Sequence, residues 1–408
     1  MSDEDETRYA HHDSLLGLLQ RGRGLGAVRA RQDPAAAAPL VYDVIRRDWR
    51  WDGVDDRGLF HARLLRDLEL SPGPVVAQLA GDEDACMRAI DVLELLALGG
   101  SDEAREGLRA HVREGAHWIR VLESVADRWP VAWWEDLEGA ARSRIGEEAD
   151  EEALPWPCEP WIRFGIRTRV FPALPAEALG DRSGEELLAV LADARSGDGP
   201  KTGVLRELAR RTPDEALIPL VPSLGTSDGR RSLPALRRAV EGLGALAVPA
   251  ARRWAADERE WLARLGADVL ADHLGPELIP GLAAELRDQW RERAWCGPDR
   301  TAKRLARFGP DAAEAVPELR RFWLHTPHSW ERPAYLEALA AIEQDGLDYA
   351  HTESLWDCEE QARLLGIARS PDLPEVRERL AALRDDPMEE AEVRAAAGAR
   401  FEEARSQL

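Results

Sequence analysis

The chain has 408 residues, of which 44% are hydrophobic and 32% are charged, so it can bury a sizeable core beneath a charged surface. It carries 54 Lys and Arg against 76 Asp and Glu, and the resulting net charge of −22 argues against nucleic acid or a membrane as the main partner. No apolar run approaches the roughly 20 residues that cross a bilayer, and the first residues lack a signal-peptide pattern, so we expect a cytoplasmic protein.

The N-terminal part of the chain predicts helices. Residues 1–12 are expected to form an acidic N-terminal tail. Apolar positions at helical spacing follow, and Pro74 leads through two apolar stripes to Leu98-Gly99, 25 positions later. We therefore expect an N-terminal array of helix pairs over residues 13–145.

The segment RRDWRWDGVDD, residues 46–56, combines arginines, carboxylates and two indoles directly after an apolar helix. A loop of that composition can hold a carboxylate or stack a planar ligand. The alternative is a salt-bridge network that two buried indoles position. We take Arg47, Trp49 and Trp51 as candidate binding residues.

Tryptophan is abundant, with 15 copies against 4 Tyr and 6 Phe, and several copies cluster in RWPVAWWEDLE and PWPCEPW. Tryptophan dominates binding hot spots, but the same indoles can instead cap the core of a helix pair. Adjacent helical positions point about 100° apart, so one narrow buried stripe cannot cover both Trp133 and Trp134. We take Trp133, Trp134, Trp156 and Trp161 as candidate binding residues, and expect one of the first two to face a groove or solvent.

One segment, residues 146–160, interrupts the helical pattern. Its sequence GEEADEEALPWPCEP holds six acids and three prolines and no basic residue. This composition opposes both helix propagation and burial. We expect an exposed linker or loop here, followed by a C-terminal array over residues 161–408.

A β-branched residue followed by proline recurs in the C-terminal part, with the prolines 30, 31 and 37 residues apart: Ile218-Pro219, Val248-Pro249, Ile279-Pro280 and Val316-Pro317. Proline suits the first turn of a helix and glycine commonly ends one. After the first three prolines, a second apolar stripe ends at Gly244, Gly275 and Gly309. The unit is an antiparallel helix pair repeated about every 30 residues, which predicts a solenoid.

The pattern of [Val/Ile]-Pro, leucine-rich helix, polar turn, second helix and Leu-Gly resembles the HEAT-repeat group, in particular the HEAT-like repeats of phycobiliprotein lyases. The segments VPAARRW…DVLADHLG and VPELRRFW…EALAAI carry the match. The resemblance implies an all-α, armadillo-like fold, an α-solenoid (α-α superhelix) of about nine to ten HEAT-like helix pairs. Such arrays serve as scaffolds, lyases, glycosylases and hydroxylases, so the resemblance predicts fold more than function.

The sequence contains no familiar apparatus for metal or phosphate chemistry. HEAT-type hydroxylases hold iron with His-Glu dipeptides, but no histidine here precedes Glu, and the closest ligand set is His111, Glu114 and His117. The four cysteines form no CxxC pair, and HExxH, P-loop, GxSxG and GxGxxG patterns are missing. We therefore expect no metal and no cofactor.

Our preferred hypothesis is a non-enzymatic scaffold or adaptor that binds a protein or peptide on its concave face. The acidic surface favours a basic partner. The alternative is an enzyme of the HEAT-like glycosylase type that acts on nucleic acid or a small metabolite in a Trp-lined groove, with Glu135 and Asp136 as the acid and base. A basic concave face would favour this enzyme, and an acidic or mixed face would favour protein binding.

Overall fold

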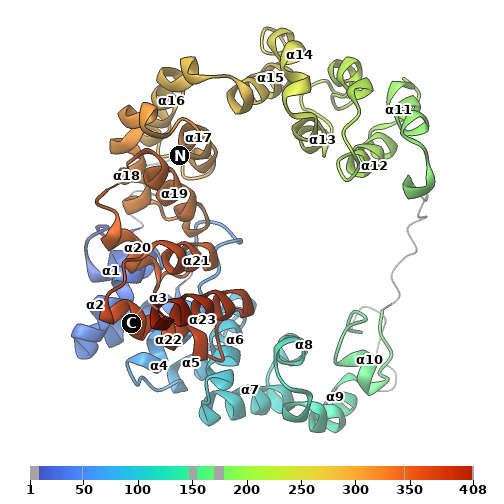
Figure 1. The fold of residues 1–408 in the computed structure, drawn as a ribbon. Helices are drawn as coiled ribbons and strands as arrows, with labels where there is room; N and C mark the ends of the chain where they lie inside the picture. The colour runs from blue at the N-terminus through green and yellow to red at the C-terminus, as the bar shows by residue number, and fades with distance from the viewer. Residues whose placement is uncertain (1–8, 48, 147–153, 170–178, 344, 407–408) are drawn as a thin grey trace. The chain divides into compact units, whose positions relative to one another are not determined.

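The computed structural model describes residues 9–47, 49–146, 154–169, 179–343 and 345–406. Helices form the regular structure of these residues, and the strand-like pairing among them is limited to an isolated bridge between Gly225 and Ser232 (Figure 1). The predicted all-α class is therefore confirmed. None of these helices combines the length and the apolar character that crossing a membrane requires.

The chain divides into two compact units: unit 1 combines residues 1–170 with residues 283–408, and unit 2 comprises residues 171–282. In the N-terminal part of unit 1 the α-helices are α1 (Leu15–Gln20), α2 (Gly24–Gln32), α3 (Pro34–Arg46), α4 (Gly58–Asp67), α5 (Gly73–Val76), α6 (Glu83–Leu98), α7 (Asp102–Glu114), α8 (Trp118–Arg128), α9 (Glu138–Ile145) and α10 (Trp161–Phe164). In its C-terminal part they are α17 (Pro298–Ala306), α18 (Val316–His325), α19 (Arg332–Ile342), α20 (Asp348–Ser354), α21 (Glu360–Arg369), α22 (Pro374–Asp385) and α23 (Ala391–Ser406).

Unit 2 contains α11 (Gly184–Ala192), α12 (Asp198–Leu208), α13 (Leu236–Leu243), α14 (Val248–Trp254) and α15 (Glu260–His273), and the boundary at residue 282 falls within α16 (Ile279–Arg291). Short 3-10 helices lie between the α-helices: η1 (Ala77–Ala80), η2 (Val131–Trp133), η3 (Glu135–Leu137), η5 (Leu179–Asp181), η6 (Glu215–Ser223), η7 (Gly244–Ala247), η8 (Pro276–Leu278), η9 (Gly309–Ala315) and η10 (Ser329–Glu331).

Most of the predicted helix ends lie at the prolines and glycines of the repeated pattern. The dipeptides at residues 248, 279 and 316 each begin an α-helix (α14, α16 and α18), where proline leaves no N–H unpaired. Gly244 and Gly309 follow with positive φ values of 56° and 53°, which glycine adopts without strain. Ile218-Pro219 differs, because it lies inside η6, where Pro222 removes a second backbone N–H within one turn.

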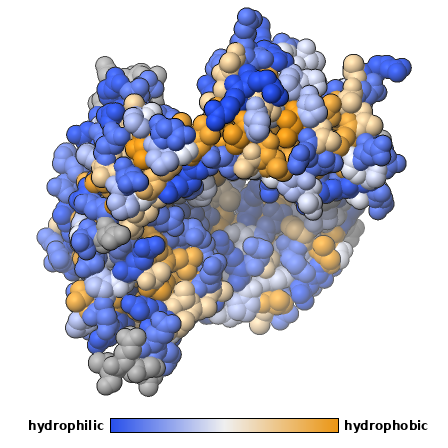
Figure 2. All heavy atoms as spheres, turned by 45° about the horizontal axis from the view of Figure 1, so that its top comes forward, coloured by the Kyte–Doolittle hydropathy of each residue, from blue (hydrophilic) through white to orange (hydrophobic). Residues whose placement is uncertain are grey.

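Helices that are neighbours in sequence pack on one another in both units. In unit 1, α6 contacts α7, α7 contacts α8, and α18 contacts α19; in unit 2, α14 contacts α15. Each contact buries the apolar stripe of the helices, such as Leu93 and Leu122 in unit 1 and Leu236 and Leu262 in unit 2. Burying one such leucine stabilises the fold by about 1.5–3 kcal/mol. Hydrophilic side chains dominate the face of the molecule in Figure 2.

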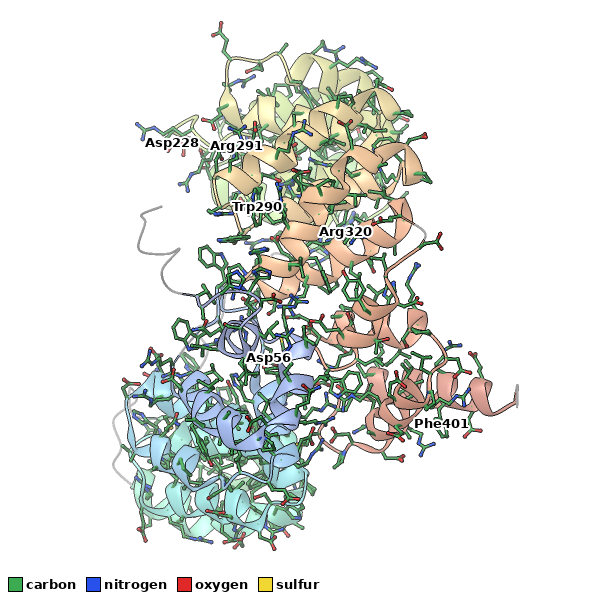
Figure 3. All side chains as sticks on the ribbon, turned by 90° about the vertical axis from the view of Figure 1, so that its left-hand side faces the viewer. Asp56, Asp228, Trp290, Arg291, Arg320 and Phe401 are labelled. Carbon is green, nitrogen blue, oxygen red and sulfur yellow. The ribbon has the colours of Figure 1, made fainter. Side chains whose placement is uncertain are left out.

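The two parts of unit 1 meet along buried ion pairs, which we call the charged seam (Arg23, Arg63, Glu353, Arg363, Asp386 and Glu389). Arg23 pairs with Glu353 at 2.8 Å, and Arg63 pairs with Asp386 at 2.9 Å and with Glu389 at 2.8 Å. Arg363 shares the Glu389 carboxylate at 2.9 Å. Residues more than 300 positions apart are therefore held in one unit, and Figures 1 and 3 show the N-terminal helices beside the C-terminal ones.

This division differs from the predicted one, which placed a single linker at residues 146–160 and one array over residues 161–408. Helical periodicity reports each helix pair but not which distant pairs meet, so it could not separate residues 171–282 from the rest. Residues 1–8 of the predicted tail and residues 147–153 of the predicted linker lie outside the described residues. Residues 154–160 contain no helix, as expected, but Leu154 is only 4% exposed, so this end of the segment packs against the protein.

Candidate functional site

A pocket in unit 1 gathers positive charge in an acidic protein. It lies where the end of α3, the loop of residues 47–57, α4 and α6 meet, and we call it the arginine pocket. Its charged lining consists of four arginines, a histidine and one carboxylate: Arg47, Arg50, Arg57, Arg88, His61 and Asp91. Trp49, Gly58 and three aliphatic side chains complete the wall.

Backbone hydrogen bonds fix the loop that carries the predicted residues. The carbonyl of Trp49 accepts from the Tyr9 hydroxyl at 2.5 Å and from Nη1 of Arg57 at 3.3 Å. Arg57 is only 4% exposed and also donates to the carbonyls of Gln20 and Pro327. Arg57 therefore holds the loop in place, and the more exposed arginines form the part of the pocket that a ligand can reach.

Two of these arginines come from different helices. Arg47 follows the last residue of α3, its Nε lies 3.1 Å from Oδ1 of Asp43, and its side chain is 57% exposed. Arg88 on α6 donates from Nη2 to the carbonyl of Arg46 at 3.1 Å, while its Nε is buried without a hydrogen-bond partner among the described residues. The exposed side chain of Arg47 can donate to an anion that enters the pocket.

The carboxyl group of Asp91, on α6, is easily neutralised. Burial and the charge of Asp56 raise the pKa of Asp91 to about 6, although Arg50 and Arg128 oppose the shift. Asp56, labelled in Figure 3, accepts the backbone N–H of Gly58 at the start of α4 at 2.9 Å. Small changes of pH near neutrality therefore determine whether Asp91 carries a negative charge in the pocket.

Trp51 is not among the residues that line the arginine pocket. Its Nε1 donates to Sγ of Cys296 at 3.1 Å, and its backbone N–H donates to Oδ2 of Asp55 at 3.1 Å. Trp49 therefore lines the arginine pocket, whereas Trp51, two positions later, contacts Cys296 and Asp55.

The adjacent indoles of Trp133 and Trp134 divide between surface and core. Trp134 is 1% exposed, packs edge-on against Phe164, and donates to the carbonyl of Trp129 at 3.4 Å. Trp133 is half-buried, packs edge-on against Trp129, and lies beneath the guanidinium of Arg105. Of this pair, only Trp133 presents a surface to solvent.

Trp156 and Trp161 divide in the same way. Trp161 is fully buried and donates to Oε1 of Glu123 at 2.8 Å, which satisfies its indole N–H. Trp156 is 45% exposed and stacks with the guanidinium of Arg169, 5.1 Å from the ring centroid. Trp161 therefore contributes to the core, and Trp156 to the surface.

The two acids of the alternative enzyme hypothesis are exposed. Arg109 donates to both carboxylate oxygens of Asp136, at 2.9 and 2.7 Å, and this hydrogen bonding lowers the pKa of Asp136. A general acid near neutral pH needs a raised pKa, so the pair with Arg109 works against that role. Glu135 lies beside it in η3, on the surface.

Of the predicted residues, Arg47 and Trp49 line this pocket, and the sequence did not indicate that Arg88, His61 and Asp91 join them. These three stand on α4 and α6, and no short motif links them to the loop. The available signal was the i,i+3 spacing of Arg88 and Asp91, which places both on one face of a helix.

No family model, no curated protein and no solved structure matches the chain. The function is therefore argued from the chemistry of the site.

Proposed function

We propose that the protein is a non-enzymatic scaffold, built as an α-solenoid of HEAT-like helix pairs, that binds a protein or peptide partner. Two observations support the architecture. Successive helices pack on one another, and β-branched residues followed by proline begin α14, α16 and α18 at the spacing of HEAT-like repeats. A repeat array of this kind offers an extended surface to a macromolecular partner.

The arginine pocket carries the proposal, because it has the composition of an anchor site for a carboxylate. Guanidinium groups form bidentate, charge-assisted hydrogen bonds with carboxylates, and Arg47, Arg50 and Arg88 converge there from two elements. Trp49 adds an aromatic wall against which the aliphatic part of an acidic side chain can pack. The partner inserts an Asp or Glu side chain, or a C-terminal carboxylate, among these guanidinium groups.

The surface of the partner around this carboxylate is basic. Long-range attraction depends on the net charge of −22, which draws in a positively charged surface, whereas the pocket acts only at hydrogen-bond distance.

Selection from a random peptide library tests the proposal. Wild-type protein should enrich peptides that carry one Asp or Glu, or a required C-terminal carboxylate, among Lys and Arg. Arg88→Ala should lose this enrichment. Arg377→Ala is the matched control, because Arg377 is a helical arginine of unit 1 that pairs with Asp372 at the surface. Enrichment of peptides without any carboxylate requirement, or equal enrichment by Arg88→Ala, would contradict the proposal.

A further inference from the structure

Three potential metal ligands from distant segments of the chain meet in unit 1. Asp52 comes from the loop before α4, Cys296 from the loop between α16 and α17, and His328 from the residue before η10. One carboxylate oxygen, the thiol sulfur and one ring nitrogen all lie within 4.8 Å of one another. All three residues belong to unit 1.

A buried carboxylate orients the histidine as a metal-binding imidazole. His328 is 4% exposed, and its Nδ1 lies 2.9 Å from Oδ1 of Asp55, which is fully buried. A carboxylate only accepts, so Nδ1 carries a proton, and Nε2 is the ring nitrogen through which a metal ion would bind after displacing any proton there. Within the described residues Nε2 forms no hydrogen bond, and it lies 4.0 Å from Oε1 of Glu331.

The same two carboxylates also position the other ligands. The second oxygen of Asp55 accepts the backbone N–H groups of Trp51 and Asp52, at 3.1 and 3.3 Å. Oε1 of Glu331 accepts the backbone N–H of Gly297 at 2.6 Å and so fixes the residue after Cys296, while Tyr335 donates to Oε2. Such hydrogen-bonded carboxylates behind the ligands are typical of metal centres in proteins.

Negative charge accumulates at this point. The carboxylates of Glu331, Asp52 and Asp55 lie close enough to the Cys296 thiol to act on it electrostatically. A divalent cation would offset this accumulation of negative charge.

We propose that Asp52, Cys296 and His328 bind a zinc ion. Thiolate, imidazole and carboxylate are the ligands that Zn²⁺ prefers, and three protein ligands leave the fourth tetrahedral position for water. On binding, the Cys296 thiol releases its proton to solvent and the thiolate coordinates the metal, while the imidazole coordinates through Nε2. The predicted absence of a metal rested on ligands close in sequence, whereas these ligands lie up to 276 positions apart.

Cobalt substitution tests the site. Reduced, tag-free full-length protein is titrated with Co²⁺, whose thiolate complexes absorb in the near ultraviolet and whose tetrahedral sites absorb strongly in the visible range. Wild type should give one equivalent of Co²⁺ with both signals, and Zn²⁺ should displace it. Cys296→Ser should lose the thiolate band, and Asp55→Asn should weaken Co²⁺ binding by about 10- to 100-fold, as expected for loss of an outer-shell partner.

Cys158→Ser is the matched control, because Cys158 is another incompletely buried cysteine of unit 1. It should leave the cobalt spectrum unchanged. As a readout independent of colour, Zn²⁺ should protect Cys296 from alkylation, measured by peptide mass spectrometry, and leave Cys158 reactive. A wild-type protein without a thiolate band, or a band that survives Cys296→Ser, would overturn the proposal, as would equal alkylation of Cys296 with and without Zn²⁺.

Discussion

Removal of one buried carboxylate should loosen the contact between the two ends of the chain. The Glu389 side chain is fully buried; it accepts from Arg63 at 2.8 Å and from two nitrogens of Arg363 at 3.0 and 2.9 Å. The change Glu389→Gln leaves both guanidinium groups buried, 8% and 2% exposed, with one negative charge fewer. Loss of one partner of a buried pair costs about 3–5 kcal/mol, so we expect the free energy of unfolding of unit 1 to fall by this amount.

The surface pair of Arg377 and Asp372 provides the control, because its side chains are 33% and 45% exposed. Asp372→Asn should leave the free energy of unfolding nearly unchanged, since water screens this pair. Burial raises the pKa of Glu389, but Arg363 and Arg63 outweigh that effect and leave it below its ordinary value. Ionised Glu389 therefore stabilises the folded state at neutral pH, and the difference between wild type and Glu389→Gln should shrink as the pH falls through the acid range.

Urea unfolding followed by tryptophan fluorescence is the appropriate assay. All tryptophans except Trp254 and Trp261 lie in unit 1, so the signal reports mainly on that unit. A cost for Glu389→Gln no larger than that for Asp372→Asn would refute the reasoning, because it would mean that the charged seam does not hold the two ends together.

Three further predictions concern the indoles and the carboxyl groups of α6. Trp134→Ala should lower the free energy of unfolding by about 3–5 kcal/mol, and Trp133→Ala by clearly less, since only Trp134 is fully buried; equal costs in urea unfolding would contradict this. Carboxylate binding in the arginine pocket should strengthen as the pH falls through about 6, where Asp91 loses its charge, and calorimetric titration of Asp91→Asn should show a flat profile. Burial raises the pKa of Glu94 to about 7, so the contribution of this group to wild-type stability should fall by up to about 3 kcal/mol between pH 4.5 and 7; Glu94→Gln should remove this contribution and make the fall of stability with pH less steep in pH-dependent melting, and an unchanged slope would contradict this.

The local features of the fold could be predicted from the sequence because they depend on neighbouring residues. Proline at the second position of α14, α16 and α18, and glycine after α13 and α17, act within one helical turn. The charged seam could not be predicted, because Arg63 and Glu389 are 326 positions apart and no periodic pattern relates them. Residues 171–282 form their own unit for the same reason.

The residues of the candidate site could likewise be predicted from the sequence only in part. The composition of residues 46–56 indicated a ligand-binding loop, and Arg47 and Trp49 do line a pocket. The separation of Trp49 from Trp51 depends on Asp55 and its contacts with residues 328–330, which the sequence does not reveal. Likewise, the abundance of tryptophan could not distinguish Trp161, which hydrogen-bonds Glu123 in the core, from the exposed Trp156.

A double-mutant cycle on a selected peptide tests the central claim, that the arginine pocket anchors a carboxylate of the partner. The cycle combines Arg88→Ala in the protein with replacement of the peptide's acidic residue by its amide, and affinities are measured by fluorescence polarisation at fixed salt. We predict a coupling energy of about 1.5 kcal/mol or more, the range found for close charge pairs across an interface. Additive effects of the two changes would contradict the claim, because they would mean that the acidic residue binds elsewhere.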